Sequence, residues 1–266
     1  MLIIYLKKLE KLNEEIKKTI QKQNPTNHEG FENHLYGIDL EKEIAKLLNS
    51  VNGEEILSYM NLDRNEIIDI VYGTDISKYT DNIKVDILII TNTQNIGISC
   101  KATKLSEVGV LEMHGDMFEK KCNIFAKNNN MKISQENLIF FKFFDDNNCT
   151  KKQCEKVNLQ KCKDFAENIE ADWKNILKFC IQGENTSAKI DYIVFYDKNL
   201  HYLYLANIDE YIGLLDTHTR KGSFNTRMIL TRTSNKSSNK EKKIDTRIKF
   251  KMINPIKILK SKNLLT

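Results

Sequence analysis

The chain has 266 residues, of which 41% are hydrophobic and 29% are charged, and its formal net charge is +5. This composition is ordinary for a protein that buries a core, and the length allows one large domain or two small ones. No apolar run approaches the ~18 residues of a membrane span, and the first residues carry charges too early for a signal peptide. We therefore expect a cytoplasmic protein without a membrane partner.

The charge is distributed unevenly along the chain. Residues 220–262 carry 14 Lys and Arg against Glu241 and Asp245, a net charge of +12, so the remaining residues sum to −7. A concentrated basic block in an otherwise acidic chain suggests a polyanionic partner such as nucleic acid. A solvated lysine-rich surface would have the same composition, so the charge alone leaves both interpretations open.

The six cysteines are scattered and form no CxxC pair. Cys149, Cys154 and Cys162 lie close together in the sequence, but their spacing matches no common zinc pattern and a fourth ligand is missing. We therefore expect free thiols in a reducing compartment.

The first 49 residues predict two helices separated by a loop. Leu and Ile recur at three- and four-residue steps over 2–20, the pattern of an amphipathic helix. Residues 23–36 are polar and contain a proline, which favours a loop. A second helix is predicted from about residue 38 to 49, with Glu41 and Glu43 on the two rims of its apolar face.

The next stretch predicts a β-hairpin. VDILIIT (85–91) and IGISCK (96–101) are short branched apolar runs joined by a polar turn. Because side chains alternate along a strand, Ser99 and Lys101 share one face, and Asp86 begins the strand that pairs with theirs. The hairpin therefore brings a carboxylate, a hydroxyl and an ammonium group to one edge.

The rest of the chain predicts helices and then strands. Residues 109–128 and most of 136–182 have helical patterns. The strands predicted after them are 190–196, 201–207, 227–233 and 246–253. The expected fold class is α/β, with a central mixed sheet flanked by helices and a C-terminal strand-rich subregion. The expected division is an N-terminal helix and linker (1–36), a core (37–185) and a β-rich region (186–266).

Hydrolysis of a phosphodiester bond needs the groups that the hairpin gathers. A carboxylate such as Asp86 can hold a divalent metal, which polarises the phosphate and lowers the pKa of bound water. A lysine such as Lys101 can orient that water or assist its deprotonation. Mg²⁺ accepts oxygen ligands, so a serine such as Ser99 can complete its shell. A purely structural strand pair with a solvated lysine would show the same short pattern.

The wider sequence resembles the MspI and HinP-type family of four-base-cutting restriction endonucleases, which have PD-(D/E)xK nuclease cores. The stretches that carry the catalytic part of this resemblance are GIDLEKEIAKLL (37–48), KVDILII (84–90) and ISCKAT (98–103). The resemblance implies that Glu41 and Asp86 bind Mg²⁺, that Ser99 stands where the family has an amide residue next to the metal, and that Lys101 is the catalytic lysine.

Later stretches extend the resemblance. VGVLEMHGDMF (108–118) resembles the family's DNA-contacting loop and helix. The stretch that leads into the family's second sheet is similar to ADWKNILKFCIQG (171–183) and IDYIVFYDKNLHYLYLANIDEYI (190–212), and its base-reading hairpin is similar to GSFNTRMILTRTSN (222–235) and RIKFKMINP (247–255). The DNA-binding residues implied are Lys104, Glu112, His114, Asn225, Arg227, Thr231, Arg232, Arg247, Lys249 and Lys251. Of these, Lys249 and Lys251, with Thr231 and Arg232, are the expected base readers. A solvated edge strand whose lysines contact only phosphates is the alternative.

The resemblance implies a type II restriction endonuclease that cuts double-stranded DNA at a short, four-base palindrome with Mg²⁺. A cognate DNA methyltransferase is the genetic partner that such an enzyme requires. Two other functions are compatible with the same residues: a repair or structure-specific nuclease on the same core, and a DNA-binding protein without catalytic activity.

Overall fold

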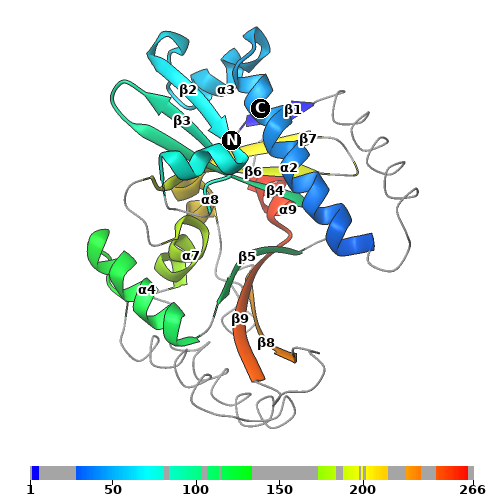
Figure 1. The fold of residues 1–266 in the computed structure, drawn as a ribbon, viewed down its shortest axis with the longest axis vertical. Coiled ribbons are helices and arrows are strands. Elements are labelled where there is room, and N and C mark those ends of the chain that lie inside the picture. Colours follow the sequence, from blue (N-terminus) through cyan, green and yellow to red (C-terminus); the bar gives the residue numbers. More distant parts are fainter. Residues whose placement is uncertain are drawn as a thin grey trace. The chain divides into compact units, whose positions relative to one another are not determined.

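The structure, a computed structural model, is shown in Figure 1. It describes residues 2–5, 28–80, 84–103, 107–113, 115–133, 173–183, 188–197, 199, 202–214, 226–234 and 244–262. The chain divides into two compact units. Unit 1 comprises Met1–Ser106, Asn185–Tyr211 and Ile256–Thr266, and unit 2 comprises Glu107–Glu184 and Ile212–Pro255.

A six-stranded mixed sheet forms the centre of unit 1. Its strands, in spatial order, are β1 (Leu2–Tyr5), β7 (Tyr202–Asn207), β6 (Ile190–Asp197), β4 (Asn95–Thr103), β3 (Ile87–Thr91) and β2 (Ile67–Tyr72). Strand β4 pairs with β6 in parallel, and every other neighbouring pair in this order is antiparallel. With the helices around it, this sheet confirms the predicted α/β class.

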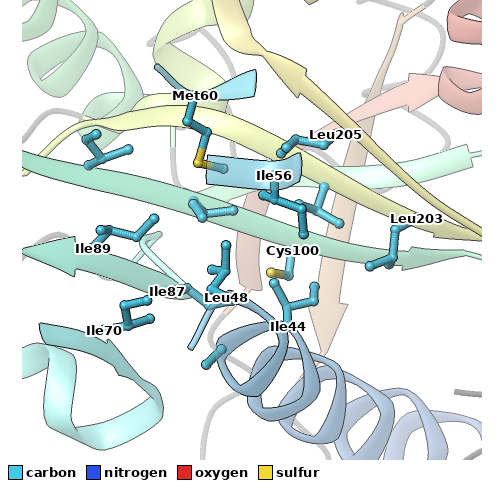
Figure 2. Packing of buried hydrophobic residues seen from close by; sticks show 14 of the residues in the cluster. Ile44, Leu48, Ile56, Met60, Ile70, Ile87, Ile89, Cys100, Leu203 and Leu205 are labelled. Atoms are coloured by element: carbon cyan, nitrogen blue, oxygen red, sulfur yellow. The ribbon is translucent and has the colours of Figure 1, made fainter. Parts of the chain in front are cut away.

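Helix α2 (His28–Leu48) covers one face of this sheet. Leu40, Ile44 and Leu48 recur at helical spacing, and each is at most 2% exposed. Together with α3 (Glu54–Tyr59) they form a cluster with strand residues such as Ile87 and Cys100 (Figure 2). Burial of one such aliphatic side chain contributes ~1.5–3 kcal/mol, so this cluster anchors the helix to the sheet.

The C-terminal end of α2 is held by an arginine from the next part of the chain. The Arg64 guanidinium donates to the carbonyl oxygens of Leu48, at 2.9 Å, and Ser50, at 2.6 Å, and also contacts the Glu54 carboxylate. Helix ends leave carbonyls without partners inside the helix, and these bonds satisfy two in this region. Arg64 lies in the short 3₁₀ helix η2 (Arg64–Glu66), directly before β2.

The opposite face of the sheet is covered by α8 (Ile208–Leu214). Tyr211 and Phe195 are both fully buried, and their ring centroids lie 5.5 Å apart. The remaining elements of unit 1 are the 3₁₀ helices η1 (Val51–Gly53) and η3 (Gly73–Lys78) and the helix α9 (Pro255–Lys262), which begins at the last residue of unit 2. No helix in the described part of the chain is long and apolar enough to cross a membrane.

Unit 2 has a sheet of its own. Strand β9 (Ile244–Ile253) is central and pairs antiparallel with β5 (Glu107–Met113) and β8 (Thr226–Ser234). Helices α4 (Gly115–Asn128) and α7 (Trp173–Gln182) also belong to this unit. They pack through aromatic contacts: the Phe179 ring lies 5.2 Å from that of Phe118 and 5.6 Å from that of Phe125.

Three element predictions were wrong near the ends of elements. Residues 2–5, predicted as helix, form β1, because pairing with β7 outweighs the local periodicity. Residues 28–36, predicted as loop, begin α2. Residues 107–113 form β5 beside β9, so the helix predicted over 109–128 begins only at Gly115.

Other element predictions were confirmed or fall outside the described residues. The hairpin and all four later strands lie at their predicted places. Of the helical stretch predicted over 136–182, only 173–182 is described, and it is helical. Residues 6–20 of the first predicted helix, and Cys149, Cys154 and Cys162, lie outside the described residues. Cys100, Cys122 and Cys180 are buried and form no disulfide among the described residues.

The predicted division of the chain into a core (37–185) and a β-rich region (186–266) stays a prediction. Strands β6 and β7 fall in the last of these predicted regions, and in the structure they belong to the main sheet of unit 1.

Gly97 lies where β4 approaches β6 most closely. A Cβ atom added there would overlap the backbone carbonyl oxygen of Lys189, and the Gly97 amide donates to the Asp191 carboxylate at 3.3 Å. The pairing of β4 with β6 shifts register directly after Gly97. A side chain at this position would push apart the only parallel pair in the described sheet.

We therefore predict that Gly97→Ala lowers the free energy of unfolding by about 1–3 kcal/mol, the usual cost of overpacking. Urea unfolding followed by circular dichroism measures it. Gly109→Ala is the matched control in a strand of unit 2, because no heavy atom lies within 4 Å of its added Cβ. Equal losses for the two variants would show that the crowding at Gly97 is not the cause.

Candidate active site

The hairpin of β3 and β4 places Asp86 beside Ser99. Ile87 lies opposite Ile98, and the Asp86 amide, one residue earlier, donates to the Ile98 carbonyl at 3.0 Å. The turn is closed by Thr91, whose amide and hydroxyl both donate to the Gln94 carbonyl, at 3.0 Å and 2.7 Å. The strand register thus brings together the three hairpin residues that the sequence singles out.

A single oxygen of Asp86 accepts three hydrogen bonds from β4. The donors to Oδ2 are the Ser99 hydroxyl at 3.0 Å, the Cys100 backbone amide at 2.6 Å and the Lys101 ammonium at 3.3 Å. Ser99 is 2% exposed, whereas the side chains of Asp86 and Lys101 are 21% and 26% exposed. The carboxylate and the ammonium therefore lie at the border between core and solvent, where a ligand can reach them.

Glu41 from α2 belongs to the same electrostatic environment. The pKa of this carboxyl is raised to about 7: burial raises it most, the negative charge of Asp86 also raises it, and the positive charge of Lys101 opposes the rise. Glu41 follows Leu40, which is buried against the sheet, so the helix places an acid at the edge of the core. The structure thus brings all four predicted catalytic residues into one region.

The two carboxyl groups fit a hard divalent cation. Each disfavours the charge of the other, and a dication between such groups removes that cost. Mg²⁺ is commonly held by one or two carboxylates and keeps several waters, so two acids suffice for it. The described residues contain no group of three or more His, Cys, Asp or Glu that could hold a metal.

The backbone amide of Cys100 is the one participant that the sequence reading missed. It makes the shortest of the three bonds to Asp86. Every residue except proline carries such a donor, so no residue type could have indicated it. The Cys100 thiol itself is buried, and burial together with the nearby acids raises its pKa well above the usual value. This thiol is therefore a neutral core group.

The predicted DNA-binding residues fall in two classes. Lys104, His114 and Asn225 lie outside the described residues. The others are on the three strands of unit 2: Glu112 on β5, Arg227, Thr231 and Arg232 on β8, and Arg247, Lys249 and Lys251 on β9.

The register of unit 2 relates these positions to one another. Arg227 lies opposite Lys251 and Thr231 lies opposite Arg247, whereas Arg232 lies opposite Thr246. Ile229 lies opposite Lys249, so alternate positions of β8 lie opposite the three basic positions of β9.

The raised pKa of Glu41 predicts that this residue destabilises the metal-free protein at neutral pH. The folded-state pKa of about 7 exceeds the ordinary 4.5, so the folded protein binds the proton more tightly. The contribution of Glu41 to the free energy of unfolding is therefore most favourable below pH 4.5, and it is lost as the pH rises through 7. Glu41→Gln cannot ionise and avoids this loss.

We expect Glu41→Gln to be more stable than the unmodified protein at pH 8, by about 1 kcal/mol after allowance for solvent screening, and equally stable near pH 4. Urea unfolding with a chelator present, at both pH values, measures the difference. Glu43→Gln, on the same helix, is the control. A stability gain for Glu41→Gln that did not depend on pH would contradict the role of ionisation.

Comparison with known proteins finds similarity in structure. No family model matches the sequence, and no curated protein matches it. Among solved structures, the chain is similar to the crystal structure of restriction endonuclease MspI in complex with its cognate DNA. The TM-score is 0.57 and the sequence identity 17%, over 92% of this chain and 99% of that one. The chain therefore has a restriction-endonuclease-like α/β fold.

Proposed function

We propose that this protein is a type II restriction endonuclease that hydrolyses phosphodiester bonds in double-stranded DNA at a short, four-base palindrome, with Mg²⁺. The observation that carries the proposal is the convergence of Asp86, Lys101 and Glu41 at the border between core and solvent, in a chain with an MspI-like fold. The same chemistry would support a less specific nuclease, so sequence-specific cutting is the property to test.

Each residue has a distinct task in this proposal. Asp86 and Glu41 would hold Mg²⁺, and the bound ion would supply Lewis-acid activation of the phosphate and of water. Because the pKa of Glu41 is raised to about 7, cation binding at neutral pH would displace the proton from the fraction of this carboxyl that still carries one. Lys101 lies next to Asp86, where its ammonium can orient the attacking water and stabilise the negative charge that develops on the phosphate.

Unit 2 is proposed to read the DNA. Strands β8 and β9 contain five of the 14 basic residues of the +12 block, and their paired positions put Arg227 opposite Lys251. Lysine donors match the O6 and N7 acceptors of guanine in the major groove, which suits Lys249 and Lys251 to base reading. A cognate DNA methyltransferase would protect the host's own sites.

Incubation of the protein with plasmid DNA and Mg²⁺ tests the proposal directly. Discrete fragments, with 5′-phosphate and 3′-hydroxyl ends, are the expected result. A smear, or cutting only at mismatched or branched DNA, would instead identify a repair or structure-specific nuclease. A mobility shift without cutting would identify a binding protein without activity.

Two variants test the assignment of the catalytic residues. Asp86→Ala and Lys101→Ala should each lower the cleavage rate by at least about a hundredfold, because one removes the metal-binding carboxylate and the other the group that serves the water. Binding to the duplex should change little, since phosphate contacts do not require either group.

The assays are plasmid cleavage and filter binding on the same preparations. Asp75→Ala is the control, because Asp75 is an exposed carboxylate paired only with Lys78 at 2.6 Å among the contacts that the structure describes for it. Cleavage at the normal rate by either active-site variant would show that the assignment is wrong.

Lysines that read bases and lysines that bind phosphates respond differently to substitution. If Lys249 and Lys251 read bases, replacement by alanine should cost about 1–3 kcal/mol on the cognate site and relax preference at one base pair. If they bind phosphates, affinity for all sequences should fall alike and the salt dependence should weaken.

We expect the first result for both residues. Fluorescence anisotropy with cognate and random duplexes between ~50 and ~200 mM salt distinguishes the two. Lys257→Ala is the control, because Lys257 is an exposed lysine of α9 within unit 1. Equal losses on both duplexes would identify the two lysines as backbone contacts.

A further inference from the structure

All the hydrogen bonds described for the Asp86 carboxylate converge on one of its two oxygens. Three consecutive residues of β4, Ser99, Cys100 and Lys101, donate to Oδ2 through a hydroxyl, a backbone amide and an ammonium group. Within the described residues, Oδ1 accepts no hydrogen bond. A carboxylate oxygen has only about two lone-pair sites, so three donors leave Oδ2 little capacity for another ligand.

We propose that Ser99 is a positioning residue that fixes the Asp86 carboxylate, so that Oδ1 is the oxygen presented to a cation. The sequence predicted Ser99 as a metal ligand, but its hydrogen is donated to Asp86 and its residue surface is 2% exposed. A hydroxyl that is buried and donates to Asp86 fixes the orientation of that carboxylate. Its effect on a bound cation is therefore exerted through Asp86.

The hydroxyl is needed because a carboxylate rotates easily about its last bond. That torsion joins sp³ and sp² carbons and has broad, shallow minima, so contacts and not bond preferences set the orientation. The Cys100 amide is fixed in the strand, and the Lys101 ammonium is on a long flexible chain. Ser99 adds a second short, rigid donor, and two rigid donors define the plane of the carboxylate where one does not.

The inference rests on the proposed metal-binding role of Asp86, but the hydrogen-bond arrangement can be tested without metal. The variants are Ser99→Ala, which removes the donor, Ser99→Cys, which keeps nearly the same volume with a weak donor, and Ser99→Thr, which keeps the hydroxyl. Thermal unfolding of each variant shows whether the core tolerates the change, and Ser99→Cys serves where Ser99→Ala does not fold.

The first measurement is hydrogen exchange of the Cys100 amide by NMR in the metal-free protein. This amide donates to Asp86 at 2.6 Å, so its protection reports the orientation of the carboxylate. We expect exchange to accelerate by about tenfold in Ser99→Ala and Ser99→Cys, the equivalent of one lost hydrogen bond, and to stay within about twofold in Ser99→Thr. Unchanged protection in both variants that lack the hydroxyl would overturn the proposal.

The second measurement counts the waters on bound Mn²⁺, used as a spectroscopic probe, by electron-nuclear double resonance in ¹⁷O-labelled water. We expect Ser99→Ala to bind Mn²⁺ about tenfold more weakly with an unchanged number of waters, because the hydroxyl acts through Asp86. One additional water in the variant would identify Ser99 as a ligand and overturn the proposal. If the unmodified protein binds no Mn²⁺, the proposed metal-dependent function fails, and the amide measurement still decides the role of Ser99.

Discussion

The bond between the Asp86 carboxylate and strand β4 constrains the whole candidate site. It joins the residue before β3 to three successive residues of the next strand, so the hairpin is closed by the Asp86 side chain as well as by backbone pairing. The charge of this carboxylate also contributes to the high pKa of Glu41 on α2 and of the Cys100 thiol. The chemistry of the site therefore follows from where the fold puts one acid.

The core explains why the fold keeps that acid in place. Helix α2 packs against the sheet through Leu40, Ile44 and Leu48, and it carries Glu41, the residue after Leu40, at the border of the core. Strand β4 is central, and Gly97 lets it approach β6. The site is thus attached to rigid elements on every side that the structure describes. This arrangement lowers the free energy of unfolding at one position, because Glu41 is a partly buried acid whose ionisation opposes folding.

Much of this could be predicted from the sequence because the hairpin is a local structure. Branched apolar runs with period-two alternation defined β3 and β4, and the alternation placed Ser99 and Lys101 on one face. Elements that depend on distant partners were harder: β1 forms only beside β7, and β5 only beside β9. The pKa of Glu41 and the amide of Cys100 could not be predicted, because burial and backbone direction exist only in the folded chain.

The parallel pairing of β4 with β6 also sets the order in which the strands of the main sheet can pair during synthesis. Residues 97–103 pair with residues 190–197, about ninety positions later, and most of the intervening chain belongs to unit 2. A growing chain can close the hairpin of β3 and β4 early, but the far edge of β4 remains unpaired until β6 has left the ribosome. For the nuclease that we propose, this order keeps the strand of Ser99 and Lys101 incomplete until the first part of unit 2 has been made.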